Sequence, residues 1–573
     1  MSISGLDIGL RALAAQQQAI DVLNHNIANA NTPGYSRQRI HLVATPPNLV
    51  PSLTQMLSRR QVGSGVTAES VDRIRDRFID FQIQTENRTL GEAQIKKQVY
   101  DKLQLVFNEP SESGINSALG QFWGTWHDLS SNPGDRSARS AVLQQALSLT
   151  NLINRTYNQL TTTRNDLAAQ AALKVADVNS IAARLANLNG QIQRAQLGGA
   201  KANDLLDRRD LLLEELSKII KFNYAVKSDD TIAVFVDGQE LVSMTSYRSL
   251  TSSLDTSFVL HVQWADNLAE VNPGGGELQG VVASANTVIA SQITSLDNLA
   301  LQIKNDVNAL HATGFDLTGA TAVNFFAGTG ARDLTIEGAI QASVDKIAAA
   351  GQPSAPGDGT VALAIAQLQH LATELDALSE LAAGGSLPIS GASVQRILTS
   401  GASPTTYTIT SSGANELTLS AVIGGVPVTQ TITISDMAAN SSQALEFSSL
   451  GITIDLRSGA VAATVADLIT DLTDAARDEL IVTTRVTVDS AYQQHVAQLG
   501  VEARGNDHTV LNELALVGSL QRQWDSISGV SLDEEAANLV KYQRAYQASA
   551  RVITVLDELL EMVVRGLGVT GRI

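Results

Sequence analysis

Each end of the chain carries a segment in which apolar residues recur at alternating steps of three and four positions. In the N-terminal segment the stripe consists of Leu6, Leu10, Leu13, Gln17, Ile20, Asn24 and Ile27. This spacing is typical of a coiled-coil seam, which is narrower than the apolar face of an ordinary surface helix. The polar members Gln17 and Asn24 would cost stability but restrict the register of such a seam. An amphipathic helix that packs only on its own domain is the alternative reading of this segment.

The C-terminal segment, residues 528–568, has the same pattern within a single long helix. Ser531 lies three residues before Glu534, a spacing typical of a helix start, and Gly566 and Gly568 are typical of a helix end. Its stripe consists of Leu539, Tyr542, Tyr546, Ser549, Ile553, Leu556, Leu560, Val563 and Leu567. A helix with one narrow apolar stripe cannot bury that stripe against itself, so each end needs a partner. The simplest arrangement pairs the two ends with each other and with copies from neighbouring subunits.

The N-terminal helix runs into the amide-rich stretch "NHNIANANTPGYSRQ", residues 24–38. Asn26, Asn29 and Asn31 are poor helix formers whose side chains bond to nearby backbone, so we expect them to satisfy the helix end. The residues that follow, Thr32, Pro33, Gly34 and Tyr35, predict a tight turn. Proline presets φ for such a turn, and Gly34 permits the positive φ that it requires. The stretch therefore predicts a stop that redirects the chain after the helix.

Composition limits the classes of protein to which the chain can belong. Its 573 residues, 44% of them hydrophobic, are enough for about four domains with real cores. The 58 acidic and 40 basic residues give a net charge of −18, which argues against nucleic acid or an anionic membrane as partner. The absence of cysteine excludes disulfides and thiol nucleophiles. The sequence also has no apolar run of the roughly 18 residues that a membrane span needs, and no signal-peptide pattern at its start.

The sequence contains no recognisable motif for catalysis, metal binding or cofactor binding. The eight histidines form no H-E-x-x-H motif, and neither a G-x-S-x-G elbow nor a P-loop occurs. His127 and Asp128 are adjacent, but neighbouring helical residues point in different directions. The sequence therefore predicts a protein with no catalytic residue, no metal site and no cofactor.

The interior of the chain reads as helices followed by strands. Phe122, Trp123 and Trp126 predict an aromatic anchor in a helical core. "TIAVFVDGQELVSM" predicts a β-hairpin with Asp237-Gly238 in its turn. Short alternating runs rich in Ser, Thr, Val and Ile predict an all-β insert at 386–460, for which a carbohydrate-binding or adhesive domain is the alternative.

The two ends resemble the terminal segments of bacterial flagellar axial proteins, the family of rod, hook and junction subunits. The resemblance rests on "SISGLDIGLRALAAQQQAIDVLNHNIANANTPGYSRQ" and on the C-terminal helix. Internal segments at 65–82, 123–146, 202–218, 309–328 and 528–552 are similar to the members found between hook and filament. The tail "RGLGVTGRI" runs past the usual end of the family.

The resemblance and the element pattern together imply an α+β multidomain fold, with long terminal helices in a coiled-coil-like inner domain, a helical rod domain and β-rich outer domains. The expected boundaries are 1–60 with 525–573 for the terminal helical assembly domain, and 61–220, 286–330 and 480–524 for the helical rod domain. A small β-rich domain at 221–285, a helical linker at 331–385, the insert at 386–460 and a return helix at 461–479 complete the chain.

The resemblance also implies a function. It implies a structural subunit, not an enzyme, that is exported by the flagellar type III apparatus and forms the hook-filament junction. The implied partners are the hook protein, the next junction protein, other copies of the chain, and a cytoplasmic export chaperone on the C-terminal helix, without nucleic acid or membrane. The implied location is the flagellum outside the cell, after a transient cytoplasmic stage. A hook or distal-rod subunit, or an exported β-domain adhesin with axial-type ends, are the alternatives.

Overall fold

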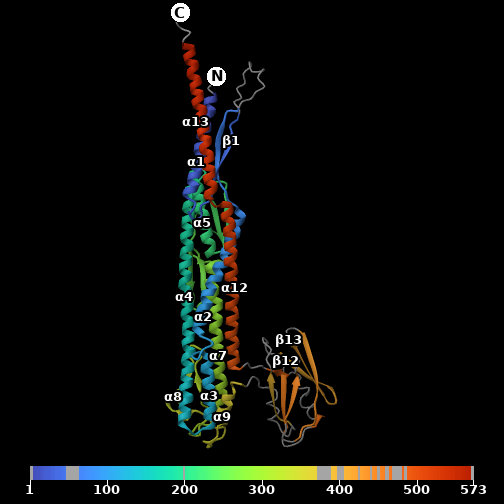
Figure 1. Cartoon of the computed structure of the whole chain (residues 1–573). Helices are drawn as coiled ribbons and strands as arrows, with labels where there is room; N and C mark the ends of the chain where they lie inside the picture. Colours follow the sequence, from blue (N-terminus) through green and yellow to red (C-terminus); the bar gives the residue numbers. More distant parts are fainter. Residues whose placement is uncertain are drawn as a thin grey trace. The chain divides into compact units, whose positions relative to one another are not determined.

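The computed structural model describes residues 4–46, 63–197, 201–370, 389–396, 405–423, 426–438, 442–447, 452–458, 464–466, 480–482 and 487–568. Long helices and several small sheets make it an α+β protein, which confirms the expected fold class (Figure 1). The chain divides into two compact units. Unit 1 comprises Met1–Lys102, Thr162–Ala290 and Glu502–Ile573, and unit 2 comprises Leu103–Thr161 and Ser291–Val501. The finer domain boundaries expected from the sequence stay predictions.

Helices of very different length make up much of the described chain. They are α1 (Ser4–Ala28), α2 (Arg77–Phe107), α3 (Ile115–Ser131), α4 (Arg136–Leu197), α5 (Asn203–Ile219), α6 (Gly276–Ala283), α7 (Ala290–His311), α8 (Gly338–Ala342), α9 (Thr360–Gln367), α12 (Val488–Ser528) and α13 (Leu532–Gly568). A π-helical turn, η1 (Ser284–Ile289), joins α6 to α7, and a 3-10 turn, η2 (Val344–Lys346), follows α8. Within the described ranges, no helix is both long enough and apolar enough to cross a bilayer.

The strands form small antiparallel sheets. They are β1 (Gln38–Ala44), β2 (Val66–Arg73), β3 (Asn223–Val226), β4 (Ile232–Val236), β5 (Gln239–Ser243), β6 (Ser246–Tyr247), β7 (Leu250–Leu254), β8 (Leu260–Trp264), β9 (Phe326–Ala327), β10 (Thr335–Ile336), β11 (Ile389–Arg396), β12 (Thr405–Gly413), β13 (Glu416–Ile423), β14 (Val426–Thr433), β15 (Ser442–Phe447), β16 (Ile452–Ser458) and β17 (Leu480–Val482). Asp237 and Gly238, both at positive φ, form the turn between β4 and β5, so the predicted hairpin is confirmed.

Strands β11 to β16 lie in the range expected for the insert, and β17 adds to the same region. The sheet orders are β11-β16-β15 and β14-β13-β12-β17. Of the return helix expected at 461–479, only residues 464–466 belong to the described part of the chain.

In unit 1 the two ends of the chain pack against each other, as the sequence predicted (Figure 1). The helices α1 and α13 are antiparallel, because Gly5 near the start of α1 lies against Leu556 while Asn26 near its end bonds Glu535 at the start of α13. Helix α2 packs on α12 in the same unit, where Ile79, Ile83 and Leu520 form one buried cluster and Leu90, Ala93 and Val510 form another.

In unit 2 an aromatic cluster forms the core, which confirms the predicted anchor. Phe122, Trp123 and Trp126 of α3 are buried, and the rings of Phe122 and Trp126 contact Phe325. His311 at the end of α7 is fully buried beside Trp126 and Phe325. Its Nδ1 lies 2.7 Å from the Val323 carbonyl oxygen, and its Nε2 accepts the Ala348 amide at 2.8 Å. His311 therefore joins three segments in its neutral form.

Among the described residues, five helical asparagines bind the first residue of a strand through both its backbone N–H and its C=O. These asparagine clamps are Asn26 on Gln38 of β1, Asn189 on Ile232 of β4, Asn179 on Leu250 of β7, Asn286 on Leu260 of β8 and Asn308 on Phe326 of β9. A side-chain amide offers a donor and an acceptor side by side, as a neighbouring strand would. Each clamp thus replaces a missing strand partner at the point where the strand begins.

Candidate functional site

The Asn-rich stretch forms the predicted turn at the end of α1. The Tyr35 amide donates to the Thr32 carbonyl at 3.2 Å, and Gly34 has φ +75°. Asn29 donates to the His25 carbonyl at 3.0 Å, so it satisfies the helix end as expected. A Cβ on Gly34 would lie 3.1 Å from the Cβ of Leu211 on α5, so the turn needs glycine for its conformation and for its space.

Asn26 is the centre of a buried polar cluster, which we call the terminal polar cluster and which consists of Asn26, Tyr35, Arg37, Gln38 and Glu535. Its amide nitrogen donates to the Gln38 carbonyl and to Glu535, both at 2.9 Å. Its amide oxygen accepts the Tyr35 hydroxyl at 2.8 Å and the Gln38 amide at 3.0 Å. All four bonding positions of the amide are therefore used. Burial, followed by nearby carboxylates, raises the pKa of Tyr35, which keeps its hydroxyl protonated as a donor.

Arg37 connects this cluster to both sides of the break between α12 and α13. Its backbone amide donates to the Ser528 carbonyl at 2.8 Å. Its Nε donates to Glu535 at 2.7 Å and its Nη1 to Glu534 at 2.8 Å. The Glu535 side chain is only 1% exposed, so these contacts and the one from Asn26 compensate a buried negative charge.

A second ionic group links α5 to the end of β2 and the residues after it. Arg73 donates to Asp207 at 2.8 Å and to Asp210 at 2.9 Å, and Arg75 lies 3.2 Å from Asp210. Burial raises the pKa of Asp207. Burial alone would also raise the pKa of Asp210, but Arg209, Arg75 and Arg73 together lower it. The carboxylates and guanidinium groups neutralise one another, and this matching is typical of a structural ion network.

On α1 the contacts with α13 at Gly5, Gly9 and Asn26 lie one residue before the predicted stripe positions Leu6, Leu10 and Ile27. A Cβ on Gly9 would lie 2.7 Å from Ile553, and one on Gly5 would lie 3.4 Å from Leu556. Ala19, Leu23 and Asn26, which follow Gly5 and Gly9 at helical spacing on α1, are buried. Of the predicted set, Leu6, Leu13, Ile20 and Ile27 are half-buried, and Leu10, Gln17 and Asn24 are exposed.

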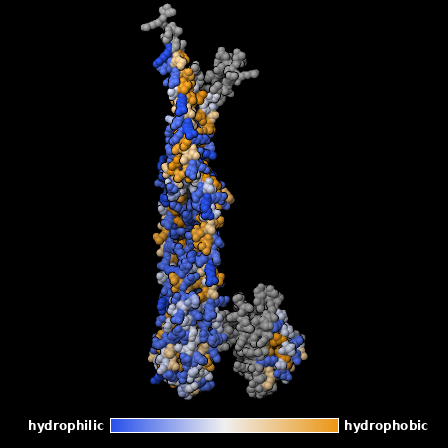
Figure 2. Space-filling model, viewed as in Figure 1, coloured by the Kyte–Doolittle hydropathy of each residue, from blue (hydrophilic) through white to orange (hydrophobic). Residues whose placement is uncertain are grey.

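On α13 the predicted stripe includes residues that touch α1. Ile553 and Leu556 pack over Gly9 and Gly5. Of the other predicted residues, Leu539, Tyr542, Tyr546, Ser549 and Leu560 are half-buried, and Val563 is exposed. A further row of the same helix is exposed, with Val552 at 52%, Val555 at 53% and Met562 at 67%. Patches of hydrophobic residues are visible over the part of unit 1 where α1 and α13 lie (Figure 2).

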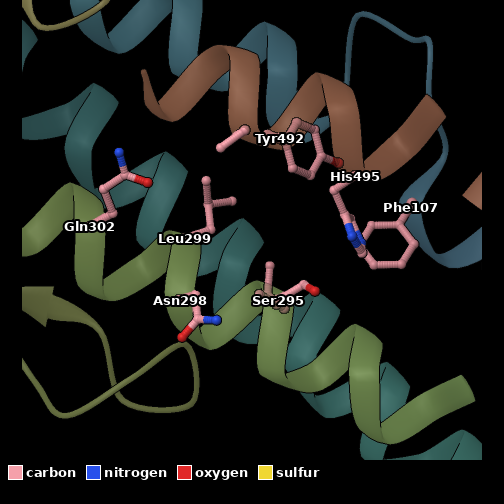
Figure 3. Close-up of a pocket in the computed structure, with 9 residues that line it drawn as sticks. Phe107, Ser295, Asn298, Leu299, Gln302, Tyr492 and His495 are labelled. Carbon is pink, nitrogen blue, oxygen red and sulfur yellow. The ribbon is translucent and has the colours of Figure 1, made fainter. Parts of the chain in front are cut away.

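A separate pocket of about 200 Å³ lies within unit 2, between the end of α2, α7 and the start of α12 (Figure 3). Its lining includes Phe107, Leu299, Tyr492 and His495. The Phe107 and His495 rings meet edge to face at 5.5 Å, and the Tyr492 hydroxyl donates to Glu109 at 3.2 Å. These side chains pack the three helices together.

Sequence reasoning misses the partners of Asn26 and the face of α1 that meets α13. The sequence predicts that Asn26 serves its own helix end, yet it bonds a glutamate 509 positions later. The predicted seam uses large side chains, whereas the close contact uses Gly5 and Gly9. The spacing of two glycines four residues apart on one helix face is the available signal, because small residues let helices approach closely.

Comparison with known proteins agrees with this arrangement. Residues 100–326 match the family model described as "Flagellar hook-associated protein FlgK helical domain". Residues 6–35 match "Flagella basal body rod protein", and residues 521–565 match "Flagellar basal body rod FlgEFG protein C-terminal". The two terminal matches coincide with α1 and its turn and with α13.

Similar proteins extend over nearly the whole chain. Flagellar hook-associated protein 1 of Bacillus subtilis is 27% identical over 99% of this chain and 99% of its own length. The protein of the same name from Salmonella typhimurium is 26% identical over 96% of this chain and 98% of its own. A solved structure of the flagellar hook junction protein FlgK from Burkholderia pseudomallei is 19% identical, covers 78% of this chain and 100% of its own, and has a TM-score of 0.47. Over nearly its whole length the chain is therefore similar to proteins named flagellar hook-associated protein 1, and three of its segments match models of flagellar protein families.

Proposed function

We propose that this chain is a subunit of the junction between hook and filament, built into the flagellum through α1 and α13. The observation that carries the proposal is the incomplete burial of the terminal helices. They cover each other along one face, but Leu10 of α1 and Val552, Val555 and Met562 of α13 stay about half exposed or more. Exposed apolar rows on paired helices are typical of surfaces that neighbouring subunits cover.

A position between hook and filament determines which proteins would cover the exposed apolar residues of α1 and α13. They are other copies of this chain, the hook protein on one side and the next junction protein on the other. The chain reaches this position by export through the flagellar type III apparatus. Strands β11 to β16 belong to unit 2, whereas α1 and α13 belong to unit 1, and we place the β-rich insert on the outside of the assembly.

Fluorescence microscopy of the tagged chain on flagella tests this function. We expect one band at the boundary between hook and filament. Label along the hook or below it would instead identify a hook or rod subunit. Loss of surface adhesion with normal motility, after deletion of 386–460, would identify an adhesin.

A point variant tests the role of the exposed row. Val555→Glu should leave the unfolding of the purified chain unchanged, since Val555 is 53% exposed, but should prevent growth of filaments. Glu558→Gln, on an exposed position of the same helix, is the matched control and should support normal filaments. Normal filaments with Val555→Glu would refute assembly through this row.

We also propose that α13 binds an export chaperone while the chain is still in the cytoplasm. An exposed row on α13 would favour self-association in the cytoplasm, and a helical chaperone that covers it would prevent this. Calorimetry of the chaperone with the full chain and with a chain lacking 531–565 tests the site. Unchanged affinity after the deletion would place the chaperone elsewhere.

A further inference from the structure

A three-residue break, residues 529–531, separates α12 from α13. The Gly529 amide donates to the Asp525 carbonyl at 3.0 Å and so closes the end of α12. A Cβ on Gly529 would lie 2.3 Å from that carbonyl oxygen, so only glycine fits this position. Glycine is also the residue that loses most backbone freedom on ordering, so the break is a natural hinge.

Contacts from the N-terminal segment hold both sides of this hinge. The Arg37 backbone amide binds the carbonyl of Ser528, the last residue of α12. The Arg37 guanidinium binds Glu534 and Glu535, in the first turn of α13. One residue therefore fixes the end of one helix and the start of the next, and we call these three contacts the Arg37 bridge.

The buried charge of Glu535 depends on the Arg37 bridge, because its side-chain partners do not come from the hinge residues. The Glu535 side chain is 1% exposed and that of Arg37 is 20% exposed, whereas Glu534 is 63% exposed. A buried carboxylate needs partners that offset its desolvation. The side chains that bind the Glu535 carboxylate, those of Arg37 and Asn26, both come from the N-terminal segment. Removal of that segment leaves Glu535 uncompensated unless α13 turns to expose it.

We propose that Arg37 locks the hinge between α12 and α13. While residues 26–38 are in place, α13 keeps one direction, along α1. When they leave, Glu535 becomes hydrated, the hinge opens at Gly529, and α13 takes many directions relative to α12. The N-terminal turn is thus a switch for the direction of the C-terminal helix.

The chain is suited to a direct measurement because it contains no cysteine. Exposed Ser519 on α12 and exposed Gln547 on α13 are replaced by cysteine and spin-labelled in the full-length chain, and their separation is measured by double electron-electron resonance. A straight continuous helix would place these positions about 42 Å apart, at about 1.5 Å per residue. This separation lies within the range of the method.

With Arg37 present we expect a single narrow distance peak. Arg37→Ala should replace this peak by a broad distribution. Arg39→Ala is the matched control, since Arg39 is an exposed arginine two positions further along the chain, and it should keep the narrow peak. A distribution for Arg37→Ala as narrow as that of the unsubstituted chain, at the same distance, overturns the proposal.

Two further measurements separate hinge opening from general misfolding. Glu535→Gln removes the charge from the other side of the bridge and should also broaden the distribution. A second label pair placed within α12 alone should keep its distance in all variants, because the contacts of α2 with α12 do not involve Arg37. Broadening within α12 would show that Arg37→Ala unfolds the region instead of opening the hinge, and this would also overturn the proposal.

Discussion

The side chain of Asn26 donates a 2.9 Å hydrogen bond to Glu535, a residue 509 positions further along the chain. Both side chains are fully buried. The end of the first helix and the start of the last helix therefore share one buried polar contact, and each of these groups is satisfied only when the other is present. Because each group needs the other, the end of α1 and the start of α13 form a single structural element.

Replacement of Asn26 by Asp should weaken this element strongly. An ionised Asp has no donor for the Gln38 carbonyl and places a second carboxylate beside Glu535, so we expect a loss of at least about 2 kcal/mol. Hydrogen exchange of peptides from 4–46 measures the local loss. Asn24→Asp, on an exposed position of the same helix, should stay within about 0.5 kcal/mol. Equal protection in the two variants would contradict the role of the Asn26 contacts.

Replacement of Gly34 by Val should destabilise the turn for two reasons. A β-branched residue at φ +75° costs about 1–3 kcal/mol, and its Cβ would also crowd Leu211. Gly238 has φ +77°, but no described atom lies within 4 Å of the place that a Cβ would occupy, so Gly238→Val measures the conformational cost alone. Urea unfolding of both variants should show the larger loss for Gly34→Val. A smaller loss at Gly34 would mean that Leu211 moves aside freely.

Enlarging Gly9 should separate the two terminal helices. Gly9→Val places atoms where Ile553 now lies, and we expect reduced protection of α13 against hydrogen exchange. Ile553→Ala in the same chain removes the obstructing atoms and should restore part of the protection. Leu10→Ala, on the neighbouring exposed face, should have little effect on the isolated chain. No rescue by Ile553→Ala would contradict the close contact between these two helices.

The stability of unit 2 should fall as the pH drops below 6.5. Burial lowers the pKa of His311 to about 4, against an ordinary value of 6.5, so the unfolded state takes up a proton before the folded state does. The loss begins near pH 6.5, grows as the pH falls, and levels off near pH 4 at about 3 kcal/mol. Urea unfolding between pH 7 and pH 4 measures this slope. His311→Gln removes the titrating group and should show a shallower slope; identical slopes would assign the effect to carboxylates.

Periodic patterns in the sequence were sufficient to predict the elements of the fold. The Asp237-Gly238 hairpin, the aromatic anchor around Trp126 and the pairing of the chain ends all follow from local spacing and turn chemistry. The hairpin and the aromatic anchor depend on residues that are close in sequence. The pairing of the ends follows because each terminal helix has an apolar stripe that it cannot bury by itself.

The contacts that define the site depend on long-range placement and were not predictable from the sequence. Nothing local distinguishes Asn26, which bonds Glu535, from Asn31, which is exposed. The choice between them depends on which side of α1 meets α13. Gly5 and Gly9 lie on the side that meets α13, and because they have no side chain they leave room there for Leu556 and Ile553. Apolar spacing predicts that a helix has a partner, but it does not specify which of two adjacent stripes the partner covers.

The asparagine clamps have a consequence for errors in folding. Side chains alternate between the two faces of a strand, so a slip of one residue would turn every buried side chain outward. Short strands such as β7 and β8 have few ladder hydrogen bonds with which to resist such a slip. A helical asparagine that binds both backbone groups of the first strand residue fixes the position of that residue, and with it the register of the strand. Asn179 and Asn286 thus select the register of β7 and β8. A strand shifted by one residue would lose the two hydrogen bonds to its asparagine in addition to burying the wrong side chains.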